Sequence, residues 1–292
     1  MLQHLLRRDK GMKIKKRWYA LFTAPLMITF FVVVIIPFFI GIGYSFVEWD
    51  GFAKHAANFV GMSNYKAVFG DKQFINAAVR TTIFTVISVI TVNVLGLFFA
   101  LLVTTGLKVK NFARTMLFLP YLIGGLILGY IWKSVFSEFF LSVGLGNWLT
   151  DATKSVIAMI VVTTWQLAGY VMIVYITGIM AIPDDVMEAA AIDGANYFQT
   201  LFSIKFPLLM PSFTICLFLA LSNCFKIYDV NVSLTGEGAN FQSEMFSLNI
   251  YNEIFSLSNF GYGQAKAIIF FLIIAIVTFI QVSITKKREV AL

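Results

Sequence analysis

Polar side chains in and beside two long uncharged stretches are the residues best suited to bind a polar ligand. Thr163, Gln166 and Tyr170 follow one another at intervals of three and four residues, so they share one face of a helix. Asn223 and Lys226 share a helix face in the same way at the end of the later stretch. Amides hydrogen-bond hydroxyl groups and aromatic faces stack on sugar rings, so this set suits a carbohydrate. The alternative is that these groups only bond to neighbouring helices.

The sequence offers little support for catalysis or metal binding. It contains two histidines, His4 and His55, and neither belongs to a cluster of His, Cys, Asp and Glu with metal-ligand spacing. No Ser–His–Asp arrangement can be assembled, which disfavours a membrane enzyme, and we expect no cofactor on this chain. The G-x-x-x-x-G-K-[ST] loop that cradles nucleotide phosphates is absent from the sequence. Any ATP must therefore be bound by another chain.

The composition indicates the environment of these polar residues. Of the 292 residues, 59% are hydrophobic and 13% are charged, whereas a typical soluble domain is about 25% charged. A soluble chain of this size could not bury so much apolar surface, so we infer an integral membrane protein surrounded by lipid. The net charge of +7 does not indicate nucleic-acid binding, because the cations lie between apolar stretches and act as topology signals.

Six stretches without Lys, Arg, Asp or Glu are long enough, or nearly so, to cross the apolar core of a bilayer about 30 Å thick. They are Trp18–Val47, Thr81–Leu107, Thr115–Trp132, Ser155–Pro183, Phe206–Phe225 and Ala267–Thr285. We therefore predict an all-α integral membrane fold with six transmembrane helices. The first stretch exceeds the about 7–15 apolar residues of a signal peptide and no cleavage motif follows it, so we expect it to be retained.

The distribution of Lys and Arg predicts the orientation. Most of the 22 basic residues lie before the first stretch, between the second and third, between the fourth and fifth, and after the last. The positive-inside rule then places both termini in the cytoplasm. We predict a basic cytoplasmic segment at 1–17, the transmembrane domain at 18–285 and a cytoplasmic tail at 286–292. Long outer segments near 48–80 and 229–266 either receive a soluble partner or merely cap the bundle.

The cytoplasmic segment between the fourth and fifth stretches, residues 182–207, does not have the composition of a flexible linker. Pro183 favours a helix start, and Asp185 with Glu188 has the spacing of a capping box. Three alanines promote the helix, and Gly194 permits the left-handed turn that ends it. A second, amphipathic helix follows. Such a stiff elbow transmits displacement, and its acidic first helix favours a protein partner over lipid headgroups.

The same segment carries a specific resemblance. Glu188-Ala-Ala, Gly194, Ile204 and Pro207 satisfy the spacing E-A-A-x3-G-x9-I-x-x-P, which resembles the EAA loop of ABC importer permeases. Three more segments are similar to binding-protein-dependent sugar permeases of the maltose and multiple-sugar group: Asn58–Tyr65, Arg114–Trp132 and Gly261–Ala265. They match the first of that group's two permease types. The motif T-x-G-G-P of relatives is replaced by Thr-Gly-Glu-Gly at 235–238.

The resemblance implies a type I ABC importer permease fold and a set of partners in the cell membrane of a prokaryote. These are a second homologous permease subunit, two ATPase subunits that hold ATP and Mg, and an extracellular solute-binding protein that delivers a carbohydrate. It implies that the elbow contacts an ATPase through Glu188, Ala189, Ala190, Asp193 and Gly194, and that the polar faces described above touch the sugar. Permeases for glycerol phosphate or polyols remain the alternative. A secondary transporter is disfavoured because the six stretches lack carboxylates.

Overall fold

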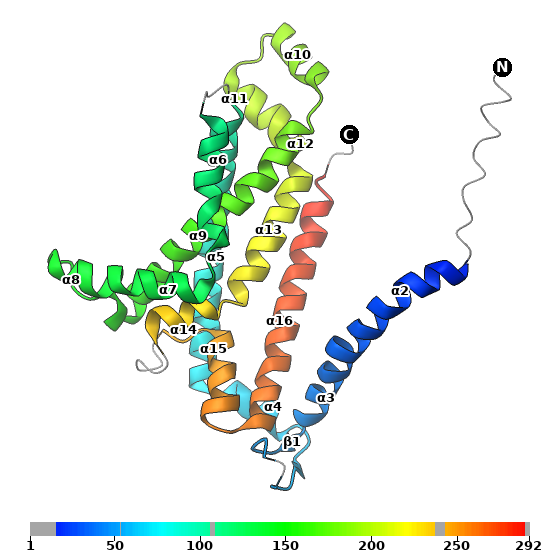
Figure 1. Cartoon of the computed structure of the whole chain (residues 1–292), viewed down its shortest axis with the longest axis vertical. Coiled ribbons are helices and arrows are strands. Elements are labelled where there is room, and N and C mark those ends of the chain that lie inside the picture. The colour runs from blue at the N-terminus through cyan, green and yellow to red at the C-terminus, as the bar shows by residue number, and fades with distance from the viewer. Residues whose placement is uncertain (1–15, 53, 106–108, 237–242, 290–292) are drawn as a thin grey trace.

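The computed structural model describes residues 16–52, 54–105, 109–236 and 243–289. The basic segment predicted at 1–17 lies almost wholly outside these residues, as does part of the altered motif at 235–238. The described chain is mostly helical, and its one small sheet pairs β1 (Val47–Glu48) with β2 (Asn58–Phe59) in antiparallel register. Figure 1 shows an elongated bundle with α10 at one end and α4 and β1 at the other.

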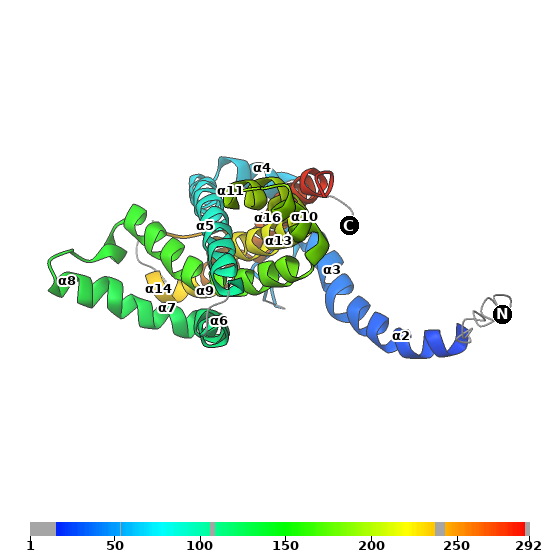
Figure 2. The ribbon, with the colours of Figure 1, turned by 90° about the horizontal axis from the view of Figure 1, so that it is seen from above.

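Four continuous helical segments among the described residues are long and apolar enough to cross a membrane. Their ranges are Leu21–Tyr44, Lys72–Thr104 (α5), Ala152–Met180 (α9) and Phe260–Lys286 (α16). The first comprises α2 (Lys16–Phe30), the π-helical turn η1 (Phe31–Ile35) and α3 (Ile36–Tyr44). Figures 1 and 2 agree that α2 extends away from the bundle. None of the apolar segment within Leu21–Tyr44 is buried.

The third predicted span is broken. In place of one helix over Thr115–Trp132, α6 (Lys110–Phe118) and the 3-10 turn η2 (Leu119–Leu122) meet α7 (Gly125–Ser134) at 95°. The helix α7 continues through η3 (Val135–Phe139) and α8 (Phe140–Ser142). The prediction of a continuous helix was wrong because Pro120 initiates the tighter 3-10 turn and the two residues after it, Ile123 and Gly124, are extended.

The fifth predicted span begins later than expected. Within Phe206–Phe225, α12 (Phe206–Leu208) still belongs to the elbow, together with α11 (Tyr197–Gln199) and η5 (Thr200–Lys205). The spanning helix α13 (Met210–Phe225) starts beyond a 69° bend. A proline sits in the first turn of the helix on each side of this bend, which accounts for the break. Counting each bent pair as one span gives six, so the predicted number is confirmed on that basis.

The core of the bundle lies where α5, α9 and α13 pack together. Tyr175 of α9 is fully buried and its hydroxyl donates to Asn93 Oδ1 of α5 at 2.8 Å. Cys216 and Cys224 of α13 are buried free thiols. Figure 2 shows these helices side by side when the bundle is viewed along its length. The core therefore fixes the relative positions of α9 and α13, the two helices that the elbow joins.

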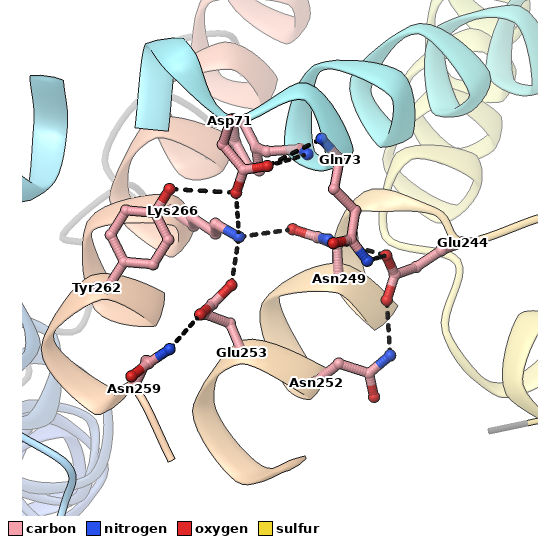
Figure 3. A network of polar contacts seen from close by, with 10 residues as sticks. Asp71, Gln73, Glu244, Asn249, Asn252, Glu253, Asn259, Tyr262 and Lys266 are labelled. Atoms are coloured by element: carbon pink, nitrogen blue, oxygen red, sulfur yellow. Dashed lines mark hydrogen bonds and ion pairs between the residues drawn. The ribbon is translucent and has the colours of Figure 1, made fainter. Parts of the chain in front are cut away.

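The segments expected to be long outer loops are largely folded. They contain α4 (Ser63–Gly70), α14 (Asp229–Thr235), α15 (Phe246–Tyr251) and the π-helical turn η6 (Asn252–Ser256). Lys266, expected at the edge of a loop, lies inside α16 with a 1% exposed side chain. Its Nζ is 2.8 Å from Asp71 Oδ2 and 2.5 Å from Glu253 Oε2, as Figure 3 shows. This cluster ties the start of α5 to η6 and α16.

Candidate functional site

A cavity of about 270 Å³ lies where α7, α9, α13 and α14 meet. In Figure 1, α7 and α14 lie at one side of the bundle, at a height between its α10 end and its α4 end, so the cavity lies partway along the bundle. The cavity is lined by four of the five residues predicted to bind a ligand, Thr163, Gln166, Asn223 and Lys226. Residues from two helices 60 positions apart in the sequence are thus brought to one place.

The two cavity residues on α9 differ in their partners. The Thr163 side chain is buried and its Oγ1 has no hydrogen-bond partner. A buried hydroxyl without a partner carries a desolvation cost, so Thr163 has an unfilled hydrogen-bonding capacity beside the cavity. Gln166 donates from Nε2 to the main-chain oxygen of Ile123 at 3.0 Å, which leaves its second N–H and its carbonyl oxygen for other bonds.

Tyr170, the fifth predicted residue, does not line the cavity. Its ring stacks on Tyr121, with centroids 4.5 Å apart and an angle of 14° between planes, and it is Tyr121 that reaches the cavity. Tyr170 therefore contacts a side chain of the cavity wall, and its direct contact with a ligand stays a prediction. Tyr121 was missed because it comes from η2, and the packing of η2 against α9 is not specified by any pattern within α9.

Asn223 and Lys226 line the cavity from the end of α13, and both are exposed. Asn223 donates from Nδ2 to the oxygen of Leu219 at 2.9 Å. Asp229, the first residue of α14, completes the charged part of the lining. A Cβ atom on Gly125 would lie 2.9 Å from the Cβ of Asp229, so only glycine lets the start of α7 approach α14 this closely.

The elbow, residues 182–207, is ordered as predicted, with one correction. Its first helix, α10 (Asp184–Ile192), ends at Gly194, whose φ of +72° is the left-handed conformation expected. The N–H groups of Gly194 and Ala195 close the turn on the oxygens of Ala191 and Ala190. The predicted Asp185–Glu188 capping box was wrong, because Pro183 is the N-cap and no side chain caps it. A capping box instead starts α11, between Asn196 and Gln199.

The surface of the elbow combines acidic and apolar side chains. Glu188, Ala189, Asp193 and Gly194 are exposed, whereas Ala190 is 6% exposed and faces its own chain. Large apolar side chains stand out beside them: Ile192 is 86% exposed and Phe198 is 68% exposed. Monomeric proteins rarely expose such neighbouring apolar side chains, so this surface has the properties of a docking face. Figure 1 shows α10 at the extreme end of the bundle.

This arrangement is that of the membrane subunits of ABC importers. A solved bacterial ABC transporter involved in the import of the acidic polysaccharide alginate has a chain that superposes with a TM-score of 0.78, covering 93% of this chain and 96% of that one at 20% identity. Residues 92–290 match the family of binding-protein-dependent transport system inner membrane components. The chain belongs to this family, so the predicted resemblance and permease fold are confirmed.

Several relatives match nearly the full length of the chain, and two of them are sugar or starch-product permeases with more than a third of their residues identical to it. The probable starch degradation products transport system permease protein AmyD of Thermoanaerobacterium thermosulfurigenes is 44% identical, over 94% of this chain and 95% of that protein. The multiple sugar-binding transport system permease protein MsmF of Streptococcus mutans is 35% identical, over 95% of this chain and 98% of that protein. The chain is accordingly a multi-pass membrane permease.

Proposed function

We propose that this chain is a transmembrane subunit of an ATP-driven importer that receives a carbohydrate from an extracellular binding protein and moves it into the cytoplasm of a prokaryote. One observation carries the proposal: the two helices that supply Thr163 and Asn223 to the cavity, α9 and α13, are the two that the exposed elbow connects. A rigid displacement of the elbow therefore moves both walls of the cavity together. Alternating access needs that coupling between a docking face and a ligand site.

The ATP-binding partners dock on the elbow in this proposal. The exposed Glu188, Ala189, Asp193 and Gly194 form the contact with one ATPase subunit, while Ala190 packs the helix against its own chain. Glu188 and Asp193 accept hydrogen bonds from basic side chains of the ATPase, and the neighbouring apolar side chains fill its groove. ATP and Mg stay on the two ATPase subunits, and this chain performs no chemistry of its own. Both termini and the elbow lie in the cytoplasm.

A second, similar permease subunit completes the membrane domain. None of the apolar segment of the N-terminal helix Leu21–Tyr44 is buried, and α2 points away from its own bundle in both views. A helix so placed has room for a neighbouring subunit as well as for lipid. The solute-binding protein then docks at the opposite end from the elbow, where α4, α15 and η6 form a folded platform.

The cavity residues would bind the sugar through hydrogen bonds and stacking. Thr163 and Gln166 face it from α9, Asn223 and Lys226 from the end of α13, and Tyr170 supports the ring of Tyr121. The relatives named for starch degradation products and multiple sugars support this ligand class. A phosphate-bearing ligand such as glycerol phosphate is the second candidate, because the Lys226 ammonium lines the cavity.

The test is reconstitution of the complete importer in proteoliposomes. The chain is purified with its partners, the co-purifying binding protein is loaded with radiolabelled maltotriose, and uptake is measured with ATP on the elbow side. We expect accumulation only when ATP and the ATPase subunits are present. Uphill uptake by this chain alone would refute the proposal, as would a complete assembly that hydrolyses ATP and moves none of the neutral sugars tested.

A further inference from the structure

Two opposite charges line the cavity without neutralising each other in an ion pair. Lys226 ends α13 and Asp229 begins α14, three residues later, and both side chains are exposed to the cavity. Among the described residues, His55 and Lys266 form ion pairs with nearby carboxylates, whereas no ion pair joins Lys226 to Asp229. Each charged group is therefore available to a ligand.

The main chain of Asp229 is held by its neighbours, which places its carboxylate at the wall of the cavity. It lies against Gly125, which has no side chain to displace it, and its main-chain oxygen accepts from Ser233 Oγ at 2.5 Å. The other polar side chains of the lining are neutral: Tyr121, Thr163, Gln166, Asn223 and Tyr228. The formal charge of the lining is thus zero, because one ammonium balances one carboxylate.

A cavity of this kind discriminates ligands by charge. A sugar hydroxyl can donate to the Asp229 carboxylate and another can accept from the Lys226 ammonium, so a neutral carbohydrate satisfies both groups. An anionic ligand is attracted by Lys226 but repelled by Asp229, and it must leave water without a net gain from the lining charges. Lys226 alone would favour anions, and Asp229 removes that preference.

We propose that Asp229 is a specificity-determining residue that makes this cavity select neutral polyhydroxylated carbohydrates over phosphorylated or carboxylated ones. The proposal rests on the proposed function, since it concerns the ligand that the permease carries. It decides between the two ligand classes that Lys226 left open. Asp229 contributes a positioned negative charge and a hydrogen-bond acceptor at the start of α14.

The experiment measures equilibrium binding to the full permease–ATPase assembly in lipid nanodiscs. The binding protein is left out, because it would apply its own selection first. The probes are maltotriose and maltotrionate, which differ at the reducing end by one carboxylate. The variants are Asp229→Asn, which removes the charge, and Asp229→Glu, which keeps it as the matched control. Saturation-transfer NMR reports weak binding of both probes in the same sample.

We expect the wild type and Asp229→Glu to prefer maltotriose, and Asp229→Asn to shift the affinity ratio toward maltotrionate by about tenfold, the size of effect expected from one unit charge in a partly desolvated site. Lys226→Gln should shift the ratio by a similar factor in the opposite direction. An unchanged ratio in Asp229→Asn overturns the charge selection. Should that variant fail to assemble, an unchanged ratio in Lys226→Gln overturns it instead.

The same data separate this inference from the proposed function. If maltotriose binds the wild type but the ratio does not respond to Asp229, only the charge selection fails. If neither probe nor any other neutral sugar binds a correctly assembled wild type, the carbohydrate function fails and the inference falls with it.

Discussion

Replacing Lys266 with methionine should destabilise the protein more than any other single charge removal at this end of the bundle. The ammonium is 1% exposed and contacts two carboxylates, whose side chains are 20% exposed for Asp71 and 9% exposed for Glu253. Lys266→Met keeps the approximate volume of the side chain but leaves two negative charges facing each other without a counter-ion. Breaking a buried pair in this way costs about 3–5 kcal/mol.

The assay is thermal unfolding of the purified importer in detergent, followed by the loss of monodisperse protein. At about 2 °C per kcal/mol for a chain of this size, the melting temperature should fall by roughly 6–10 °C. Lys66→Met is the matched control, because Lys66 is exposed on α4 and should change the melting temperature by less than about 1 °C.

A compensated variant tests the reasoning itself. Lys266→Met combined with Asp71→Asn and Glu253→Gln removes all three charges, so it should recover most of the lost stability. If Lys266→Met melts within about 2 °C of the wild type, the cluster contributes little. If the triple variant is no more stable than the single one, the loss arises from packing around the lysine stem and the electrostatic explanation is wrong.

Three further outcomes follow from the elbow, the cavity and the same ion cluster. Gly194→Val should lower ATP-driven uptake at least about tenfold, because φ of +72° strains a β-branched residue, whereas Gly194→Asn tolerates that conformation and should retain most uptake. Thr163→Val removes a buried hydroxyl that has no protein partner, so the melting temperature should not fall. Because that hydroxyl is proposed to bond the sugar, the KM for sugar should rise about threefold or more. Burial alone would raise the pKa of Asp71, but hydrogen bonds and the charge of Lys266 hold that pKa below its usual value. Its contribution to stability is therefore complete above about pH 4 and is lost as the pH falls through the lowered pKa, so Asp71→Asn should flatten the acid limb of a melting curve measured against pH.

The span count and the elbow could be predicted because their signals are local. Charge-free stretches identify apolar helices whatever packs against them. Gly194 and the alanines before it specify a helix and its end within a dozen residues. The third charge-free stretch gave no sign of the break after η2, because Ile123 and Gly124 are as uncharged as the helices on either side. A stretch defined only by the absence of charge does not register two extended residues.

The cavity was only half predictable for a related reason. Periodicity placed Thr163 and Gln166 on one face of α9, and that face does line the cavity. Tyr121 and Asp229 come from η2 and α14, and no local pattern specifies that these elements pack against α9. Lys266 was misplaced because a charged residue was taken to end a span, whereas two carboxylates distant in sequence allow it to lie buried inside α16.

The bend of 95° between η2 and α7 has a consequence for one side chain of the cavity. The bend withdraws the Ile123 carbonyl from helical bonding, and at bilayer depth that oxygen must find another donor. Gln166 supplies it from α9, so the amide that points at the cavity also anchors the bend. One amide therefore serves both features, the corner through one N–H and the cavity through its remaining N–H and its carbonyl oxygen.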